Sequence, residues 1–508
     1  MNSATIPGVL DAAARAHPGL LALTDARRTL SYLELSEASR SVAAVLIDAG
    51  VGPGDRVAVW GQNSIEWAVA SLGVLFAGAT VVPVNARYTM VEAADIIGRA
   101  GCGAAFADNE ASGRDLAADA AAVLAGHPVF PLADVLRIAT PSALGDVDAR
   151  LRRLTGGDIS HIQFTSGTTG RPKGAMLRHA AMVRTTEDWV RAVGLRRGDR
   201  YPVIAPFSHV GGHKTGLLAC LVAGAALRPF ATLDVGHLAA VIREWEATIL
   251  QGPPAMFQAL LTHARDGGAP LSSLRVAVTG AATVPPPLVR DLRDVLGVED
   301  VFTAYGLTEA TGVCTITRRD DPPDVVASTS GSAITDVDVR IVDEADREVA
   351  PGDRGEIVVR GYNVMAGYLD DPEATAAVVR NGWLHTGDIG WIGEDGNLRI
   401  VDRLKDLIIV GGLNVYPAEI ERVLVEHPSI VEAAVIGIAD ERMGEVPAAF
   451  VVTTNAADGL LDDDVVAFCT TQLAKFKVPR TIIRVDALPV NSAGKVSKVE
   501  LRRSNGIG

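Results

Sequence analysis

The chain has 508 residues, of which 48% are hydrophobic and 21% are charged, so it can bury large cores and should divide into at least two domains. Its formal net charge of −14 argues against nucleic acid as a partner, because a phosphate backbone is bound by basic surface. Its four cysteines lie far apart without a CxxC pair. This spacing indicates neither a disulfide framework nor a zinc site.

The N-terminus lacks a basic segment followed by an apolar stretch, so we expect no secretion signal. The most apolar runs, 67–84 and 216–227, are too short or too rich in Gly, Ala and Pro to span a bilayer, which takes about 20 apolar residues. We therefore expect a cytoplasmic protein without stable membrane insertion, and we keep a homodimer open as its assembly.

Apolar β-branched strands alternate along the chain with Ala- and Leu-rich helical stretches. The sequence predicts strands at 56–61, 79–85, 275–284 and 431–440, and a helix from about Ser64. This alternation is typical of α/β folds with mainly parallel sheets. We expect a large N-terminal α/β domain.

A different pattern begins near Ser330, where short strands alternate with acidic and Pro-Gly turns over 339–361. It predicts a small antiparallel β-subdomain. The best single domain boundary lies at Asp402 to Asp406. We therefore expect an N-terminal domain of 1–402, a hinge at 403–406 and a small α+β C-terminal domain of 407–508.

The stretch "FTSGTTGRPKGAML" (164–177) is a polar, glycine-rich loop between apolar flanks. It is not a Walker A motif, because its lysine follows a proline and no G-K-[ST] opens a helix. Its glycines would still let the backbone approach an anion, while four hydroxyl side chains donate hydrogen bonds and Lys173 adds positive charge. A polyphosphate fits this description, although composition alone is equally compatible with a flexible surface loop.

Six motifs follow one another in a fixed order: "TSGTTGRPKG", "AYGLTEA", "WLHTGDIG", "VDRLKD", "GGLNVYPAEIE" and "PVNSAGKVSK". Together they resemble the adenylate-forming enzymes, which include acyl-CoA synthetases, firefly luciferase and the adenylation domains of nonribosomal peptide synthetases. The resemblance covers nearly the whole chain. It implies ATP, Mg²⁺ and coenzyme A as cofactors, and a carboxylic acid that is first adenylated and then transferred to the CoA thiol.

The resemblance implies a nucleotide site with distinct parts. Glu309 would bind magnesium, Asp388 and Arg403 would hold the ribose, and Tyr305 would stack near adenine. The remaining nucleotide-binding residues would be Thr165, Ser166, Gly167, Thr168, Thr169, Gly170, Lys173, Gly280, Ala281, Ala282 and Thr308, of which Thr308 is also a catalytic candidate. Without the family, Glu309 would be interpreted as a helix-capping residue, Tyr305 as core and Asp388 as a turn residue.

The resemblance implies that the C-terminal domain carries one set of residues for adenylation and another for the transfer to CoA. Lys495 resembles the catalytic lysine of adenylation, and Lys405 matches the hinge about which the domain rotates. After that rotation, Gly411 and Gly412 would line the path of the CoA thiol. Residue type alone would make Lys495 a solvated tail lysine and Gly412 a strand-turn glycine.

The acyl pocket resembles the segment 206–227, with His209 near the reacting carboxylate and Val210, Gly211 and Lys214 lining the site. His209 and His213 have the i,i+4 spacing of metal ligands. The glycines between them and the lack of a nearby third ligand argue against zinc.

Lys214 is one of only seven lysines among 47 basic residues, so a need for an ammonium group is a reasonable explanation of its presence. An ammonium in an apolar pocket needs a polar partner. We therefore expect Lys214 to contact the ring end of an oxygen-bearing acid. The alternative is a lysine whose stem packs on the surface and whose head reaches solvent.

Within the family, the combination of motifs is most similar to the steroid-catabolic CoA ligases of actinobacteria. These act on hexahydroindane-propanoate, the bicyclic remnant of cholesterol that keeps the C and D rings. Medium- or long-chain fatty-acid and aryl-acid CoA ligases are the alternative. A stand-alone amino-acid adenylation domain and a phosphotransferase are more distant alternatives.

Overall fold

The computed structural model describes residues 4–504, apart from 112, 138–143, 166–171, 267, 269, 281–283, 404–405, 411–412, 441, 455–461 and 491–494. The side chains of residues 403 and 414 also lie outside the description. The chain divides into two compact units. The first holds the residues up to 280 together with 284–339 and 359–384, and the second holds 340–358 and the residues from 385 onward.

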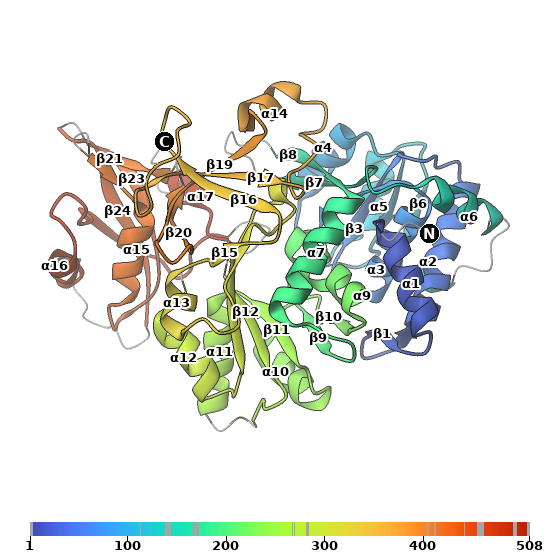
Figure 1. Ribbon diagram of the computed structural model, residues 1–508, viewed down its shortest axis with the longest axis horizontal. Helices are drawn as coiled ribbons and strands as arrows, with labels where there is room; N and C mark the ends of the chain where they lie inside the picture. The colour runs from blue at the N-terminus through green and yellow to red at the C-terminus, as the bar shows by residue number, and fades with distance from the viewer. Residues whose placement is uncertain are drawn as a thin grey trace. The chain divides into compact units, whose positions relative to one another are not determined.

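A six-stranded sheet forms one part of the first unit (Figure 1), in the order β6-β5-β3-β4-β7-β8. All neighbouring strands are parallel except β7 and β8, which form an antiparallel pair. The strands are β3 (Arg56–Gly61), β4 (Thr80–Asn85), β5 (Ala104–Ala107), β6 (Val129–Pro131), β7 (Ile159–Thr165) and β8 (Lys173–Arg178). The helices between them are α3 (Ile65–Phe76), α4 (Met90–Ala100), α5 (Leu116–Val123) and α6 (Leu144–Arg153), with a 3₁₀ turn at Leu132–Arg137.

Alternating side chains of these strands face two different helix layers. Ala58, Val82 and Ala105 pack with α4 and α5 in one buried cluster. Helix α3 is buried along its whole length, and Ser64 caps it by accepting a hydrogen bond from the backbone of Trp67. The expected helix near Ser64 is therefore confirmed.

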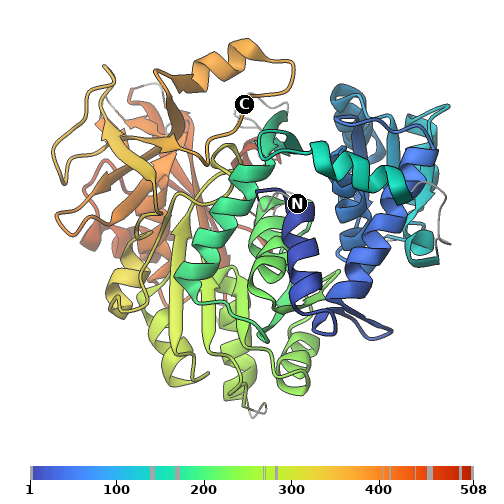
Figure 2. The same cartoon turned by 45° about the vertical axis from the view of Figure 1, so that its right-hand side comes forward.

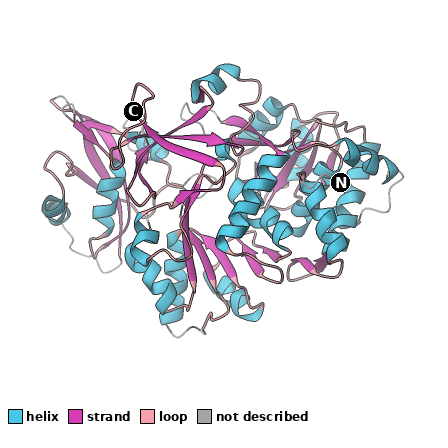
Figure 3. Ribbon diagram, viewed as in Figure 1, coloured by secondary structure: helices cyan, strands magenta, loops and turns pink. Residues whose placement is uncertain are grey.

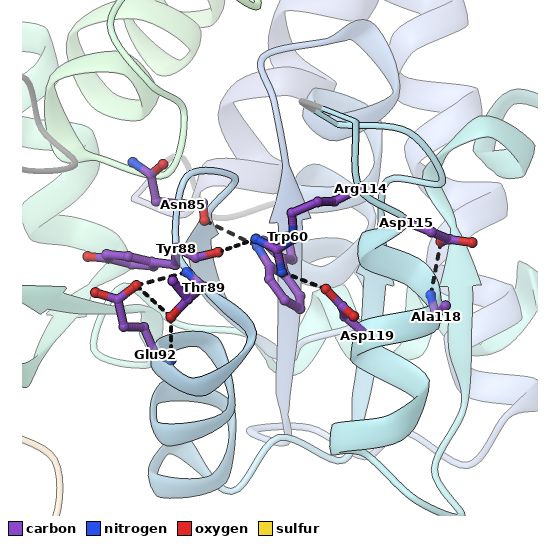
Figure 4. A network of polar contacts seen from close by, with 9 residues as sticks. All are labelled: Trp60, Asn85, Tyr88, Thr89, Glu92, Arg114, Asp115, Ala118 and Asp119. Atoms are coloured by element: carbon purple, nitrogen blue, oxygen red, sulfur yellow. Dashed lines mark hydrogen bonds and ion pairs between the residues drawn. The ribbon is translucent and has the colours of Figure 1, made fainter.

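Polar contacts fix the loops at the carboxyl ends of β3 and β4 (Figure 4). Arg114 donates to the Tyr88 carbonyl over 2.8 Å and to Asp119 over 2.6 Å, and its guanidinium lies over the Trp60 ring. The Trp60 indole donates to the Asn85 carbonyl over 3.1 Å. A capping box of Thr89 and Glu92 then starts α4. These bonds set the position from which α4 leaves the sheet.

A second sheet of the first unit has the order β11-β12-β13-β14-β15. Strands β11 to β13 are parallel, and helices α10 to α13 pack with one face of them in a single hydrophobic cluster (Figure 3). The strands are β11 (Ile249–Gly252), β12 (Val276–Thr279), β13 (Asp300–Tyr305), β14 (Thr315–Ile316) and β15 (Ser332–Ala333). The helices are α10 (Val235–Glu244), α11 (Pro254–Arg265), α12 (Pro286–Asp294) and α13 (Pro323–Ser328).

A third sheet has the order β2-β1-β10-β9 and lies with the N-terminal helices, which are blue in Figure 2. Its strands are β1 (Leu21–Thr24), β2 (Thr29–Ser31), β9 (Arg200–Val203) and β10 (Ala226–Pro229). Tyr32 joins the first helices to this region, because its buried hydroxyl donates to the carbonyls of Cys220 and Ala225. The helices here are α1 (Ile6–Ala16), α2 (Tyr32–Asp48), α7 (His179–Val193), α8 (Val210–Gly212), the π-helix η2 (His213–Leu218) and α9 (Ala219–Ala223).

Three strands contain the points at which the chain passes from one unit to the other: β16 (Val337–Val342), β17 (Gly355–Gly361) and β19 (Trp383–Ile392). Helix α14 (Pro372–Val378) and strand β18 (Val379–Arg380) belong to the first unit. Strand β20 (Leu398–Arg403) pairs antiparallel with the second half of β19. The expected antiparallel β-subdomain after Ser330 is confirmed.

The C-terminal part of the second unit contains a further five-stranded sheet. Its order is β22-β21-β24-β23, and β25 pairs in parallel with β24. Its elements are β21 (Ile408–Val410), β22 (Leu413–Val415), α15 (Pro417–Val425), β23 (Ile430–Asp440), β24 (Gly444–Thr453), α16 (Asp462–Gln472), β25 (Thr481–Arg484) and α17 (Lys498–Ser504). The fold is thus the expected mixed α/β arrangement, with a large N-terminal and a smaller C-terminal part.

All four cysteines are buried free thiols, as expected from their spacing. Among the described residues, no helix is long and apolar enough to cross a membrane.

Candidate active site

The glycine-rich loop connects the two strands of a hairpin. Thr165 ends β7 and pairs with Lys173, the first residue of β8. Residues 166–171, which include the predicted Ser166, Gly167, Thr168, Thr169 and Gly170, lie outside the described part of the chain. The hairpin therefore places the two ends of the predicted phosphate loop side by side.

Arg99 of α4 contacts the residues that flank this loop. Its guanidinium lies over the ring of Phe164, with Cζ 5.3 Å from the ring centroid, and it donates to the Pro172 carbonyl over 2.7 Å. It also forms an ion pair with Asp95 at 3.0 Å. One side chain thus connects the residue before Thr165 to the residue before Lys173.

A segment far along the chain pairs with β8 and brings a tyrosine to Lys173. Met176 donates its backbone N–H to the Gly367 carbonyl over 2.9 Å, and Leu369 donates to the Gly174 carbonyl over 2.8 Å. Tyr368 between them lies with its ring centroid 5.3 Å from Lys173 Nζ. This cation–π contact stabilises the ammonium group beside the loop.

Glu309 lies between Thr165 and Tyr368. Thr165 Oγ1 donates to Glu309 Oε1 over 3.2 Å, and the Tyr368 hydroxyl donates to the same oxygen over 2.9 Å. Burial and the Glu309 carboxylate raise the pKa of Tyr368 well above its usual range, so the phenol keeps its proton and donates. Glu309 lies in the 3₁₀ turn η3 (Thr308–Ala310), which has no side-chain cap. The alternative of a capping glutamate is therefore wrong.

The donor chemistry of Glu309 fits a magnesium ion carried by phosphates. Among the described residues, its Oε2 accepts no hydrogen bond. No group of three His, Cys, Asp or Glu side chains suited to a metal occurs in that part of the chain either. Mg²⁺ keeps several waters and is commonly held by one or two carboxylates together with substrate phosphates. A carboxylate oxygen that accepts from no described residue, on the side chain that Thr165 contacts, matches that requirement.

The predicted adenine residues lie at the carboxyl ends of two neighbouring parallel strands. Gly280 follows β12, Tyr305 ends β13, and the strands pair through Thr279 and Thr303. Tyr305 is 7% exposed. Ala281 and Ala282 lie outside the described residues. Ligands of open α/β sheets bind at such carboxyl ends, so Gly280 and Tyr305 occupy the expected edge.

The turn that carries Glu309 also packs against the predicted acyl segment. It closes through a hydrogen bond from Gly312 N–H to the Leu307 carbonyl over 2.8 Å. Gly312 has φ +85°, and a Cβ at this position would lie 3.2 Å from Val210 and 3.4 Å from Lys214 Cε. Val210 and Lys214 thus lie against the same turn as Glu309, and glycine permits the close approach.

His209 precedes α8 and caps it. Its Nδ1 accepts a hydrogen bond from the Gly211 backbone over 3.1 Å, so the neutral ring carries its proton on Nε2. Lys214 is fully buried, and the alternative in which its head reaches solvent is therefore wrong.

His213 lies in a different environment from His209. It is 1% exposed, and its Nε2 lies 3.2 Å from Nε2 of the buried His161. Ser160 Oγ donates to the Leu177 carbonyl and lies 2.9 Å from His161 Nδ1. His161 thus has Ser160 Oγ at one ring nitrogen and His213 Nε2 at the other. The two histidines connect η2 to β7, the strand that leads into the glycine-rich loop.

The remaining predicted residues belong to the second unit. Asp388 of β19 is 7% exposed and lies opposite Arg403 of β20 in the strand register. Lys495 is partly exposed and precedes α17. The hinge lysine Lys405 and the CoA-site glycines Gly411 and Gly412 lie outside the described residues.

Sequence patterns missed Tyr368, Arg99 and His161. Tyr368 is one of seven tyrosines and lies 59 positions from Glu309, and no motif that we recognised includes it. Arg99 is one of many arginines on predicted helices. The contacts of Tyr368 follow from its pairing with β8, and those of Arg99 follow from the position of α4. Neither can be derived from a sequence motif.

These features define an adenylate-forming enzyme: the α/β sheets, the Glu309 carboxylate next to Thr165, and the neighbouring ends of β12 and β13. Residues 10–369 match the AMP-binding enzyme family, and residues 419–495 match the AMP-binding enzyme C-terminal domain. The chain belongs to the AMP-binding enzyme family.

Two relatives are similar over nearly their entire length. A 3-(7a-methyl-1,5-dioxo-octahydro-1H-inden-4-yl)propanoyl:CoA ligase of Mycobacterium tuberculosis (strain ATCC 25618 / H37Rv) is 45% identical over 98% of this chain and 98% of its own. The ligase of the same name from Rhodococcus jostii (strain RHA1) is 44% identical with the same coverage. The crystal structure of ATP-bound MatB from Rhodopseudomonas palustris has a TM-score of 0.88 at 31% identity and covers 99% of each chain. The chain is an AMP-forming acyl-CoA ligase that uses ATP, Mg²⁺ and CoA.

Proposed function

We propose that the acid is a bicyclic propanoate with ring ketones, of the hexahydroindane-propanoate class, and that its CoA thioester enters steroid-ring degradation. The observation that carries this proposal is the near-full-length identity of 45% and 44% to two ligases whose names specify a 1,5-dioxo-octahydroindenyl propanoyl group. A fully buried lysine beside the turn of Glu309 supports a substrate with oxygen atoms on its rings.

The nucleotide roles are assigned to the residues of the predicted phosphate loop and of the predicted adenine site. Thr165 and Lys173, with Ser166, Gly167, Thr168, Thr169 and Gly170, would donate to the phosphates. Gly280, Ala281, Ala282, Tyr305 and Thr308 would surround the adenine and the α-phosphate. Glu309 would hold Mg²⁺, which when bound neutralises phosphate charge. The support is the contact of Thr165 and Tyr368 with Glu309 Oε1, which leaves Oε2 for the metal.

The other assignments come from the second unit and the acyl segment. Asp388 and Arg403 would hold the ribose, and their opposed positions on β19 and β20 support this. His209 would face the acid carboxylate with its Nε2–H, because Nδ1 is occupied by Gly211. Lys495 would stabilise the carboxylate and α-phosphate during adenylation. Lys405 would be the hinge, and Gly411 and Gly412 would line the CoA path, with domain limits at 402 and 407.

The proposed chemistry has two displacement steps. A carboxylate oxygen of the acid attacks the α-phosphorus of ATP, and the bond to pyrophosphate breaks. The sulfur of CoA then attacks the acyl carbon, the bond to AMP breaks, and the thiol proton is released. Both transition states carry concentrated negative charge. Lys173 and the loop donors would stabilise this charge, and Lys495 would contribute in the adenylation step alone.

A pyrophosphate-release assay over a panel of acids tests this proposal. The panel contains bicyclic keto-propanoates, medium- and long-chain fatty acids, aryl acids and amino acids. We expect AMP and pyrophosphate as products and the highest kcat/KM with the bicyclic keto acid. Preference for a fatty or aryl acid would replace the proposed substrate with that alternative, and release of ADP would indicate a phosphotransferase.

We also propose a cytoplasmic location and keep a homodimer as the candidate assembly. The cofactors support the location, because ATP and CoA are abundant in the cytoplasm. Sedimentation at several protein concentrations tests the assembly, and a single monomeric species throughout would exclude the dimer.

A further inference from the structure

Lys214 is a buried basic residue to which the two displacement steps assign no role. It lies in the π-helix η2 and has 0% exposure. Among the described residues, its Nζ has no hydrogen-bond partner. A buried ammonium without a partner costs several kcal/mol or loses its proton. Burial accordingly lowers the pKa of Lys214 to about 7, although Cys314 and Asp188 oppose this effect.

The acidic side chain that acts on Lys214, Asp188, already has other partners. Asp188 binds Arg191 through Oδ1 at 2.6 Å and accepts from the Tyr362 hydroxyl through Oδ2. On the following residue of η2, Thr215 donates to Gln251 Oε1 over 2.8 Å, and Tyr201 donates to the same oxygen over 2.9 Å. Asp188 thus has other partners, and in the described part of the chain the Nζ of Lys214 has no acceptor.

The position of Lys214 identifies that molecule as the acid. Its Cε lies beside Gly312, which closes the turn that carries Glu309. Val210 packs on the same glycine, directly after the His209 that caps α8. An acid whose carboxylate is near His209 and the nucleotide would extend along this segment, and an oxygen on its far end would meet the ammonium.

We infer that Lys214 determines specificity by donating a hydrogen bond to a ring ketone of the acid. This inference rests on the proposed bicyclic keto acid as substrate. Alkyl chains offer no acceptor, so they leave the buried amine unsatisfied. A ketone oxygen satisfies it, and the same interaction rejects an analogue that lacks the oxygen.

The test uses acids matched in shape that differ only in the ring oxygens: the bicyclic keto-propanoate and its deoxo analogue. The rate of pyrophosphate release gives kcat/KM for each acid with the wild type, Lys214→Met and Lys214→Gln. Lys475→Met serves as the control, because it removes an exposed lysine with the same change in charge. Circular dichroism checks that each variant is folded.

We expect the wild type to favour the keto acid by about 10- to 100-fold, the effect of one hydrogen bond to a charged donor. In Lys214→Met this ratio should fall close to one, chiefly through a higher KM for the keto acid, while the deoxo acid keeps its kcat/KM within about threefold. Lys214→Gln should keep part of the preference through its amide N–H, and Lys475→Met should behave as the wild type.

Three results would overturn the inference in distinguishable ways. If the wild type activates both acids equally well, the ring oxygen has no partner, and no variant is needed to reject the contact. If a folded Lys214→Met variant lost kcat/KM equally for both acids, the lysine would act at the carboxylate instead. If the wild type activates neither bicyclic acid, the proposed substrate itself is wrong, and the inference fails with it.

Discussion

The hydroxyl of Tyr368 donates to Glu309 Oε1 over 2.9 Å, while its ring lies 5.3 Å from Lys173 Nζ. One side chain thus orients both the proposed magnesium ligand and the lysine of the phosphate loop.

Tyr368→Phe should weaken adenylate formation while keeping the ring beside Lys173. Loss of one hydrogen bond to a carboxylate costs about 1.5–3 kcal/mol, so we expect roughly a tenfold or greater fall in kcat/KM for ATP, with a higher Mg²⁺ requirement. Pyrophosphate–ATP exchange at a series of Mg²⁺ concentrations measures both. Glu309→Gln should be more severe, and an unchanged Mg²⁺ dependence in Tyr368→Phe would show that the tyrosine does not position the metal ligand.

Substitutions in the C-terminal part should separate the two half-reactions. Lys495→Ala should reduce adenylation by about 10²-fold or more, the usual effect of losing one transition-state donor, and leave thioester formation from supplied acyl-adenylate largely intact. Gly412→Leu should do the opposite, because a side chain there would block the thiol. Rapid-quench assays measure the rate of each step. If both substitutions slowed both steps equally, the C-terminal domain would not use different residues for adenylation and for thioester formation.

Arg99→Met should impair the binding of ATP. The guanidinium lies over Phe164 and donates to the Pro172 carbonyl over 2.7 Å, so its removal frees both residues that flank the loop. We expect a rise of about tenfold in KM for ATP, consistent with the loss of one charged hydrogen bond, and a smaller change in kcat. Arg99→Lys should restore part of the affinity, since it keeps a cation and a donor. If Arg99→Met changed the KM for the acid but not the KM for ATP, a role of Arg99 at the loop would be contradicted.

Unfolding at mildly acidic pH should take up protons at buried histidines. Burial lowers the pKa of His179 and His213 to about 4 and holds that of His161 well below its usual value. Between about pH 6.5, where an unfolded histidine titrates, and about pH 4, the unfolded state binds more protons. The free energy of unfolding therefore falls as the pH falls through this window.

Calorimetry of urea unfolding at pH 5, in buffers that differ in ionisation enthalpy, measures this proton uptake. His213→Gln keeps a donor toward His161 and should lower the uptake by about one proton. His127→Gln, which removes a histidine at an exposed position, is the control and should leave the proton uptake unchanged. Equal uptake by the wild type and His213→Gln would show that His213 is protonated in the folded protein.

Local sequence was sufficient wherever the determining interactions lie close together along the chain. The cap at Ser64 and the capping box at Thr89 and Glu92 are formed within four residues, so they start α3 and α4 without tertiary help. The order of six motifs was sufficient for the chemical class, because that chemistry needs a phosphate loop, a metal carboxylate and a mobile lysine in one chain. Lys214 also stood out from the sequence, since lysine is rare here and its neighbours are apolar.

Only the tertiary structure decided which of those residues meet and which partners they have. Tyr368 reaches Glu309 because the backbone of 366–369 pairs with β8, an alignment that depends on the register of distant segments. The separate environments of His209 and His213, four residues apart, arise because His213 faces His161 across the packing of η2 on β7. The burial of Lys214 likewise follows from Val210 and Gly312, which lie about a hundred residues apart. Such contacts depend on how helices and strands pack against one another. The hydrophobic pattern of a single segment determines which of its faces is buried, but it does not determine which side chain of another segment lies opposite.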